Sequence, residues 1–441
     1  MKFFIKKLGC PKNDVDGDYI AARLIDAGHK PVDIDAEADI VIVNTCGFIL
    51  PAKEESIEEI LQYEEMKKTG KIKRLYVTGC LSQRYGPDSL KEIEGVDAIF
   101  GLGDHDNIVR AIDTGDNYKS AFEYGKSADI KYISGVKRYF DPSYPYEYLK
   151  ISDGCNRYCA YCAIPDIRGR YRSRPLAELL SEAEQAADKG KKELILVSQE
   201  GTGYGRELKD GTDIIKLLSG LEKIEGISWI RLMYLHPESI NDNLIKYMAA
   251  SSKVLNYFDI PLQHINNRLL NLMNRRVTRA DIESVIENIR NHAPEATIRT
   301  SFIAGFPGET EEEFKELEDF VIATGFERLG VFGYSPEEGT AAAAMENQNS
   351  VEIVGERQDR LMAVQQEIAF KKNIDLIGTI QQVIIDRVDT GSPSVGRTRG
   401  DCPDIDQMVY IDDGDLRVCD IIDVRVTMAE GYDLIAKTEK V

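Results

Sequence analysis

Short apolar runs that favour β-strands alternate with helical stretches over the first part of the chain. The expected strands are residues 3–5, 40–44, 75–78 and 98–100, and the expected helices are residues 19–27, 54–68, 87–94 and 104–113. Strands and helices in alternation are typical of a parallel sheet with helices on both faces. The pattern therefore predicts an α/β domain with a doubly wound parallel sheet over residues 1–114.

A second alternation follows residues 115–147, a stretch rich in Gly, Tyr and Pro that is predicted to be a linker. From residue 148 onward six apolar runs are candidate strands, namely 149–151, 194–198, 230–234, 257–260, 298–303 and 329–332. Segments with apolar residues at helical spacing separate them. Six βα units predict an incomplete (βα)6 barrel over residues 148–375, which ends in a long amphipathic helix.

The last part of the chain, residues 376–441, changes character. Its β-rich runs 380–385, 408–411 and 420–426 are separated by Gly and Asp turns. Short strands with such turns predict a small antiparallel β-barrel. The expected order of domains is thus a parallel sheet, a partial barrel and a small β-barrel.

The composition is that of an ordinary globular protein. Hydrophobic residues make up 43% and charged residues 29% of the chain, which argues against a disordered or low-complexity protein. No apolar run approaches the roughly 18 residues of a membrane helix. Residues 1–10 also lack the apolar core of a signal peptide. We therefore expect a cytoplasmic protein without a membrane partner.

Acidic residues outnumber basic ones by 75 to 55, which leaves a net charge of −20. This balance excludes a uniformly basic nucleic-acid binder, although it leaves room for a local basic groove. A basic partner would be attracted to such a protein.

The strongest chemical signal is a cysteine run, Cys155, Cys159 and Cys162, directly after the first expected barrel strand. Eight cysteines in a reducing compartment favour metal ligands or catalytic groups over disulfides. Three thiolates at the spacing C-x3-C-x2-C can hold three irons of a four-iron cluster. The fourth iron is then left open, because closed structural clusters normally take four cysteines. The alternative, a structural zinc knuckle, lacks a fourth ligand nearby.

A second set of cysteines is dispersed along the N-terminal domain. Cys10, Cys46 and Cys80 each lie just past an expected strand, and the carboxyl ends of parallel strands emerge at one edge of a sheet. The neighbouring Gly47 and Gly79 allow tight turns around a bulky inorganic group. One cysteine at a strand end is usually a small buried hydrophobe. Three at equivalent positions predict a second shared cluster, again with one iron lacking a protein ligand.

Other polar residues at the expected catalytic face of the barrel are weaker candidates. Gln199 and Glu200 follow the second barrel strand, where the loops of barrel enzymes gather. Arg299 and Gly305 belong to a fifth strand that ends in small residues, which would let a ligand approach the backbone. We predict cofactor contacts at these four positions. The residues at similar positions, which could instead satisfy one another, are Arg231, His236, Gln263 and His264.

The whole chain resembles the methylthiotransferases of the radical S-adenosylmethionine superfamily. The resemblance is carried by Leu8-Gly9-Cys10-Pro11-Lys12-Asn13, residues 43–49, the cysteine run with Ala163-Ile164-Pro165, residues 257–264 and Arg397-Thr398-Arg399. Within that family the chain looks most like the RimO branch, which modifies an aspartate of small-subunit ribosomal protein S-twelve. One departure is Glu200-Gly201, where most members would have Asp-Thr. The resemblance implies a methylthiotransferase domain, a radical S-adenosylmethionine barrel and a TRAM-type barrel.

The resemblance also implies two [4Fe-4S] clusters and S-adenosyl-L-methionine as cofactors. The cluster on the cysteine run would bind S-adenosylmethionine, with Tyr161 against the adenine. It would release a 5'-deoxyadenosyl radical that takes hydrogen from an unactivated carbon. The cluster on the dispersed cysteines would present methylated sulfur to that carbon, so all six cysteines are implied to be catalytic. A low-potential electron donor is implied as a partner.

Two substrates remain open, an aspartate of the basic ribosomal protein and a transfer RNA. Residues 378–441 carry 13 Asp plus Glu against 7 Lys plus Arg, a charge that would repel phosphates and attract a basic protein. Methylthiolation of the aspartate β-carbon is therefore the leading prediction, with the substrate protein free or on the ribosome or its precursor. A non-enzymatic iron-sulfur carrier is the weakest alternative, because it would need no barrel.

Six aspartates fall close together in the terminal barrel. They could dock the basic substrate or be solvated turn residues. They are Asp401, Asp404, Asp406, Asp412, Asp413 and Asp415.

Overall fold

The computed structural model describes residues 1–86, 90, 93–115, 124, 130, 137–389, 391–412 and 415–439. The chain divides into two compact units. The first contains Met1–Phe140, Lys150–Glu182 and Ser335–Ala343, and the second contains Asp141–Leu149, Ala183–Tyr334 and Ala344–Val441. The cysteine run therefore belongs to the same unit as the N-terminal sheet.

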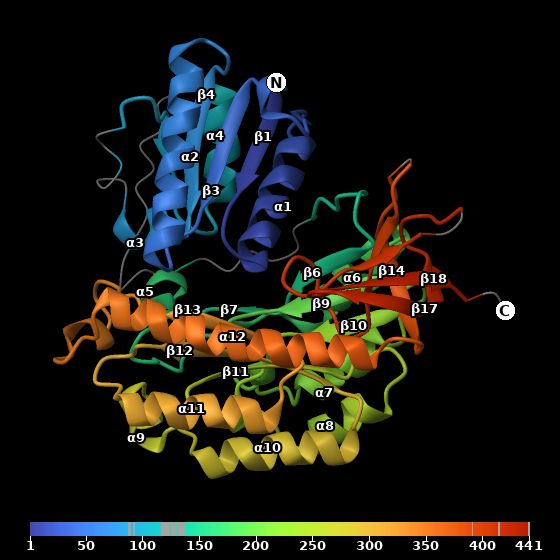
Figure 1. The fold of residues 1–441 in the computed structure, drawn as a ribbon. Coiled ribbons are helices and arrows are strands. Elements are labelled where there is room, and N and C mark those ends of the chain that lie inside the picture. The colour runs from blue at the N-terminus through green and yellow to red at the C-terminus, as the bar shows by residue number, and fades with distance from the viewer. Residues whose placement is uncertain are drawn as a thin grey trace. The chain divides into compact units, whose positions relative to one another are not determined.

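A five-stranded parallel sheet forms the N-terminal part of the first unit (Figure 1), with strand order β2-β1-β3-β4-β5. The elements are β1 (Lys2–Lys7), α1 (Pro11–Asp26), β2 (Lys30–Pro31), β3 (Ile40–Thr45), α2 (Leu50–Lys68), β4 (Arg74–Gly79), α3 (Cys80–Tyr85), β5 (Ala98–Ile99) and α4 (His105–Thr114). Side chains of β3 alternate between the two faces. Ile40 and Ile42 pack with α1 and α4, whereas Val41 and Val43 pack with α2. The predicted doubly wound sheet is confirmed.

Two N-terminal helices differ from the prediction. Helix α1 begins at Pro11 rather than at residue 19. The prediction placed the start too late because the first turns bury polar side chains such as Asn13 and Asp16, so apolar residues at helical spacing do not mark the buried face there. Helix α3 begins at Cys80, directly after β4. The helix expected over residues 87–94 lies largely outside the described residues, as does most of the expected linker 115–147.

The rest of the first unit surrounds the cysteine run. Strands β7 (Ser152–Asp153) and β8 (Arg172–Ser173) pair in an antiparallel ladder, and the short helix α5 (Ile164–Arg168) lies between them in sequence. Helix α5 packs against α3, and its residue Ile167 contacts Cys80 in a small apolar cluster.

The barrel region supplies six strands in two hydrogen-bonded sheets, β10-β9-β6 and β11-β12-β13. Strand β10 lies beside β11, where the Leu235 N–H donates to the Asp259 carbonyl at 2.8 Å. The strands are β6 (Tyr146–Lys150), β9 (Glu193–Val197), β10 (Trp229–Leu232), β11 (Tyr257–Gln263), β12 (Thr297–Ala304) and β13 (Arg328–Gly333). The predicted six-stranded partial barrel is confirmed.

Helices follow most of these strands (Figure 1). They are α6 (Leu176–Asp188), α7 (Ile214–Leu221), α8 (Asp242–Ala250), α9 (Asn267–Leu272), α10 (Arg279–His292), α11 (Glu311–Thr324) and α12 (Val351–Asp375). Among the described residues, no helix combines the length and the apolar character needed to cross a membrane.

The C-terminal strands form a closed barrel of order β14-β15-β16-β18-β17. Its strands are β14 (Ile380–Arg387), β15 (Ser394–Thr398), β16 (Val409–Ile411), β17 (Ile421–Glu430) and β18 (Asp433–Thr438). The barrel is antiparallel as predicted, except that β16 and β18 pair in parallel. It is joined to the rest of the second unit by a buried ionic group, in which Glu193 accepts from Arg231 at 2.8 Å and contacts Arg397 at 2.9 Å.

The six clustered aspartates do not share one environment. Asp401 is fully buried and pairs with Arg328 at 2.6 Å, and the Asp406 carboxylate accepts from the Tyr257 hydroxyl at 2.6 Å. These two acids therefore support neither alternative drawn from the sequence, because they neutralise or satisfy partners within the second unit. The exposed members are Asp404, Asp412 and Asp415, and Asp413 lies outside the described residues.

Candidate functional site

The dispersed cysteines lie at the carboxyl ends of three neighbouring strands of the N-terminal sheet. Cys10 lies between β1 and α1, Cys46 follows β3, and Cys80 follows β4. Burial raises the pKa of the Cys46 thiol and raises that of Cys80 to about 12. Repulsion of the thiolate by Cys10 also raises the pKa of both residues, and repulsion by Cys46 adds to the rise at Cys80. The structure thus brings the three predicted ligands to one edge of the sheet.

Asn13 ties together the loops that carry these cysteines, a role that the sequence analysis missed. Its side-chain amide donates to the carbonyls of Leu8, Asn44 and Thr45 at 2.8, 3.0 and 3.2 Å. In return, the Asn44 side chain donates to the Asn13 carbonyl at 2.7 Å. Asn13 therefore links the end of β1, the end of β3 and the start of α1. The sequence feature that could have indicated this role is the position of Asn13, three residues after Cys10.

Gly9 lets the first cysteine loop approach the second. Its φ of +90° is a left-handed conformation that side chains disfavour. A Cβ atom at this position would lie 2.7 Å from the Sγ of Cys46. The close approach of these two loops therefore requires glycine at residue 9.

The cysteine run forms a turn between β7 and α5. The Cys155 N–H donates to the Gly169 carbonyl at 3.1 Å, and the Cys162 N–H donates to the Cys159 carbonyl at 3.0 Å. Cys155 is buried, whereas Cys159 and Cys162 are partly exposed. Tyr161 is also partly exposed. The run is therefore partly accessible, as a site for a small-molecule cofactor would need to be.

Both sets of cysteines fit a four-iron cluster. Each set supplies three cysteines, the number that leaves one iron of a four-iron cluster without a protein ligand. Among the described residues, no group of three or more His, Cys, Asp or Glu side chains surrounds a single metal-ion position.

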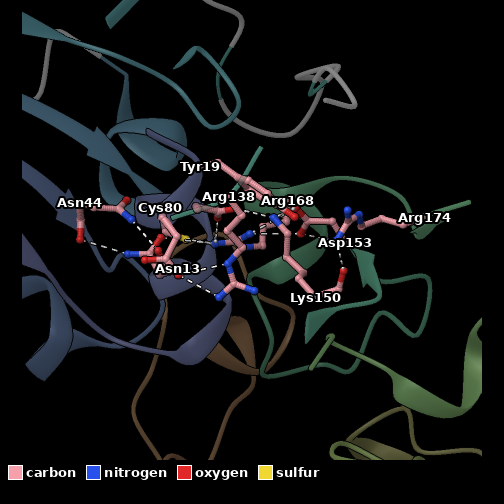
Figure 2. Close-up of polar contacts among 12 residues, drawn as sticks. Asn13, Tyr19, Asn44, Cys80, Arg138, Lys150, Asp153, Arg168 and Arg174 are labelled. Carbon is pink, nitrogen blue, oxygen red and sulfur yellow. Dashed lines mark hydrogen bonds and ion pairs between the residues drawn. The ribbon is translucent and has the colours of Figure 1, made fainter. Parts of the chain in front are cut away.

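Arg168, at the end of α5, points toward Cys80 (Figure 2) and is 1% exposed. Its guanidinium donates to the Cys80 Sγ at 3.4 Å, to Asp16 at 3.0 Å and to Asp153 at 3.2 Å. Lys150 pairs with the same two aspartates. Although burial alone would raise the pKa of Asp153, Lys150 and Arg168 hold it well below its usual range. The sequence analysis did not single out Arg168, because nothing in its spacing distinguishes it from a surface arginine.

A second buried ionic group extends this network (Figure 2). Arg138 donates to Asp18 at 2.8 Å and to Glu182 at 3.1 Å. Glu182 also accepts from the Tyr19 hydroxyl at 2.9 Å and from Arg174 at 2.7 Å. Helix α1 is thereby joined to the segment that follows the cysteine run, and the first unit holds its two cysteine sites in one body.

The loop Ser335–Ala343 contacts both cysteine-bearing segments of the first unit. Glu337, 2% exposed, pairs with Lys53 at 2.7 Å and with Arg84 at 2.8 Å. Arg84 also donates to the carbonyl of Gly47, the residue after Cys46, at 2.8 Å. At the other end of the loop, the Ala342 N–H donates to the carbonyl of Ala160, within the cysteine run, at 2.8 Å.

The predicted cofactor contacts Gln199, Glu200, Arg299 and Gly305 all lie in the second unit. Both side-chain amide atoms of Gln199 are buried and lack a hydrogen-bond partner in the part of the chain that the structure describes. Such an orphaned amide fits a residue that binds a ligand. Glu200 is buried and accepts from Ser239 at 3.4 Å. Gly305 directly follows β12, with φ +77°.

Arg299 is placed differently from these three residues. It lies near the start of β12, whereas Gly305 lies past its carboxyl end. Its guanidinium donates to Asp259 at 2.9 Å and contacts Asp406 at 3.5 Å, and these carboxylates help to raise its pKa. The predicted cofactor contact of Arg299 is therefore not favoured by its position, because ligands of such barrels bind at the carboxyl ends of the strands.

Family models match three parts of the chain. Residues 2–101 match Uncharacterized protein family UPF0004, residues 149–321 match the Radical SAM superfamily, and residues 377–438 match the TRAM domain. Membership of the radical SAM superfamily implies a [4Fe-4S] cluster and S-adenosylmethionine as cofactors.

Solved structures with the same fold are distant in sequence. The chain superposes on TsrM from Kitasatospora setae, a radical S-adenosylmethionine methyltransferase with tryptophan and a cofactor analogue bound, with a TM-score of 0.57. The identity is 15%, over 83% of this chain and 89% of that one. The cobalamin-dependent enzyme OxsB aligns with a TM-score of 0.51 and 13% identity, over 80% of this chain and 56% of that one.

Curated relatives match almost the whole chain. The ribosomal protein uS12 methylthiotransferase RimO of Bdellovibrio bacteriovorus is 43% identical over 98% of this chain and 96% of its own length. The protein of the same name from Aquifex aeolicus is 43% identical over 99% and 97%, and that of Clostridioides difficile is 42% identical over 99% and 98%. The chain therefore belongs to the RimO family of radical S-adenosylmethionine methylthiotransferases.

Proposed function

We propose that this protein adds a methylthio group to the β-carbon of an aspartate side chain in ribosomal protein uS12, the substrate for which its relatives are named. The observation that carries the proposal is the presence of two sets of three cysteines in one compact unit. A reaction that installs a carbon–sulfur bond at an unactivated carbon needs both radical generation and a sulfur donor near the same substrate.

The six cysteines have separate assignments in this proposal. The cysteine run holds the cluster that binds S-adenosylmethionine, and Cys10, Cys46 and Cys80 hold a second cluster. When bound, these cofactors supply hydrogen abstraction from the substrate carbon and a methylated sulfur to replace that hydrogen. The protein itself orients the reacting groups and excludes water from them. The burial of Cys80 and Cys155 supports this role.

Residues of the second unit are proposed to hold S-adenosylmethionine. The orphaned amide of Gln199 offers one donor group and one acceptor group, and Gly305 lies directly after the carboxyl end of β12. Tyr161 is assigned to the adenine, and Glu200 to a polar contact. We place the enzyme in the cytoplasm, with uS12 free or on the ribosome or its precursor, and with a low-potential electron donor as a further partner.

The proposal is tested by incubating anaerobically reconstituted enzyme with S-adenosylmethionine, a strong reductant and purified uS12. Intact-mass measurement should show the gain of one methylthio group, and fragmentation should place it on an aspartate. A uS12 variant with that aspartate changed to Ala is the matched control. Bulk transfer RNA, incubated in parallel, should remain unmodified. Modification of the transfer RNA with none of uS12 would overturn the proposal.

A further inference from the structure

We infer that Arg168 is a positioning residue for the cluster on the dispersed cysteines, through an N–H···S hydrogen bond that sets the reduction potential of that cluster. The inference rests on the proposed function, because it requires a cluster at Cys10, Cys46 and Cys80. It goes further by assigning a role to a residue that binds no metal.

The geometry of Arg168 is that of a fixed donor. One nitrogen, Nη2, donates to the Cys80 Sγ at 3.4 Å and to Asp16 at 3.0 Å, while Nη1 donates to Asp153 at 3.2 Å. The planar guanidinium serves these acceptors from two nitrogens in a fixed geometry, whereas a lysine would have to serve all three from a single nitrogen on a flexible stem. Because the residue is 1% exposed, solvent does not compete for these bonds.

The surrounding charges explain why a cation is tolerated at this position. Arg168 and Lys150 carry two positive charges, and Asp16 and Asp153 carry two negative charges, so the group is neutral as a whole. Arg168 therefore acts on Cys80 through an oriented hydrogen bond, and the four charged side chains together add no net charge. Hydrogen bonds to the ligating sulfurs and local net charge are among the factors that set the potential of iron–sulfur clusters. Because the group is neutral, the hydrogen bond is the factor that acts here: it stabilises the more negative, reduced state, so Arg168 raises the potential.

The place of Arg168 in the chain adds a second consequence. It lies six residues after Cys162, at the end of a helix that packs against α3, whose first residue is Cys80. The residue that tunes one cluster thus belongs to the segment that carries the other. A purely structural ion pair would require the contacts with Asp16 and Asp153 but not the contact with sulfur.

The test separates the hydrogen bond from the charge. The background is the full-length C155A/C159A/C162A protein, in which the dispersed cysteines are the one remaining set of three, and an EPR-monitored redox titration measures its cluster. In this background R168M leaves the group one charge more negative, whereas D16N/R168M keeps it neutral without a donor to Cys80. We expect both variants to have a lower potential than the parent, with the larger shift in R168M. R168K, which keeps the charge, should also lower the potential.

The matched control is D18N/R138M. It removes a neighbouring buried pair of the same unit, in which Arg138 binds Asp18 and Glu182. Its potential should equal that of the parent. Unchanged potentials in R168K and in D16N/R168M would overturn the inference, and if the double variant loses its iron, R168K decides alone. Absence of iron from the parent background would instead overturn the two-cluster function, and the inference with it.

Discussion

The dispersed cysteines come from three separate strand ends of the N-terminal sheet, whereas the cysteine run lies in one loop between β7 and α5. The first site exists only when β1, β3 and β4 are paired and Asn13 joins their loops. The second is shaped mainly by hydrogen bonds within or beside its own turn. The difference teaches that the dispersed site is a property of the tertiary fold, while the cysteine run is largely a local structure. Mutations that disturb the sheet should therefore affect the two sites unequally.

The largest effect is expected from removing either set of cysteines. The reconstituted wild type should carry about eight irons by the stoichiometry of two four-iron clusters. A C10A/C46A/C80A variant should lose about half of them, still form 5'-deoxyadenosine, and attach no sulfur to uS12. A C155A/C159A/C162A variant should lose the other half and form no 5'-deoxyadenosine. Iron assays and product analysis measure these outcomes, and retention of the full iron content in either variant would contradict the assignment.

The next effect concerns the packing of the dispersed site. Gly9→Ala places a methyl group 2.7 Å from the Cys46 Sγ at a φ of +90°. We expect loss of the dispersed cluster with retention of the cluster on the cysteine run. Gly28→Ala is the matched control, because Gly28 has a φ of +88° but no atom within 4 Å of the added Cβ.

The control variant should carry only the backbone strain, about 1 to 2 kcal/mol. Its iron content should therefore be that of the wild type. Equal iron loss in both glycine variants, measured after the same reconstitution, would show that backbone strain, and not packing against Cys46, causes the loss of the cluster.

The same difference explains what the sequence could and could not predict. The cysteine run is recognisable because its spacing is local, and the dispersed cysteines because each follows a recognisable strand. Asn13 and Arg168 were missed as positioning residues, since their partners depend on tertiary contacts that have no period in the sequence. The start of α1 was missed for the same reason. Asp401 and Asp406, which looked like surface acids, are buried because Arg328 and Tyr257 of distant strands meet them.

A moderate, pH-dependent effect is expected from His105 at the start of α4, which covers one face of the sheet that holds the dispersed site. Burial lowers the pKa of His105 to about 4, from 6.5 in an exposed histidine. Between these values the unfolded chain binds a proton that the folded chain does not. The free energy of unfolding should therefore fall as the pH drops from about 6.5 to 4, by up to roughly 3 kcal/mol at 1.36 kcal/mol per unit.

His105→Gln removes this titration without adding a charge. Thermal unfolding of wild type and variant at pH 7 and pH 5 measures the effect. The wild type should lose more stability on acidification than the variant, and its dispersed cluster should be released before that of the cysteine run. The same acid-induced change in both proteins would mean that other groups govern the acid sensitivity of the sheet.

The smallest effect is expected from a change that touches neither cysteine site. Asp412 and Asp415 are exposed on the terminal barrel, unlike the buried Asp401 and Asp406. D412K/D415K should slow association with the basic uS12 several-fold at low salt, because complementary charge mainly sets the rate of encounter. The difference should shrink as ionic strength rises and the Debye length falls below about 10 Å.

Surface plasmon resonance with immobilised uS12 measures the association rate, and iron content should stay at the wild-type level. The control D188K/D319K makes the same change in net charge at exposed positions of α6 and α11. If the local charge of the barrel attracts uS12, D412K/D415K should associate with uS12 more slowly than this control does. Equal rates in the two variants would assign the effect to overall charge, and the acidic barrel would then have no part in choosing the substrate. A change in iron content would show that the barrel acts on the clusters, which would break the separation between a fold-dependent site and a local one.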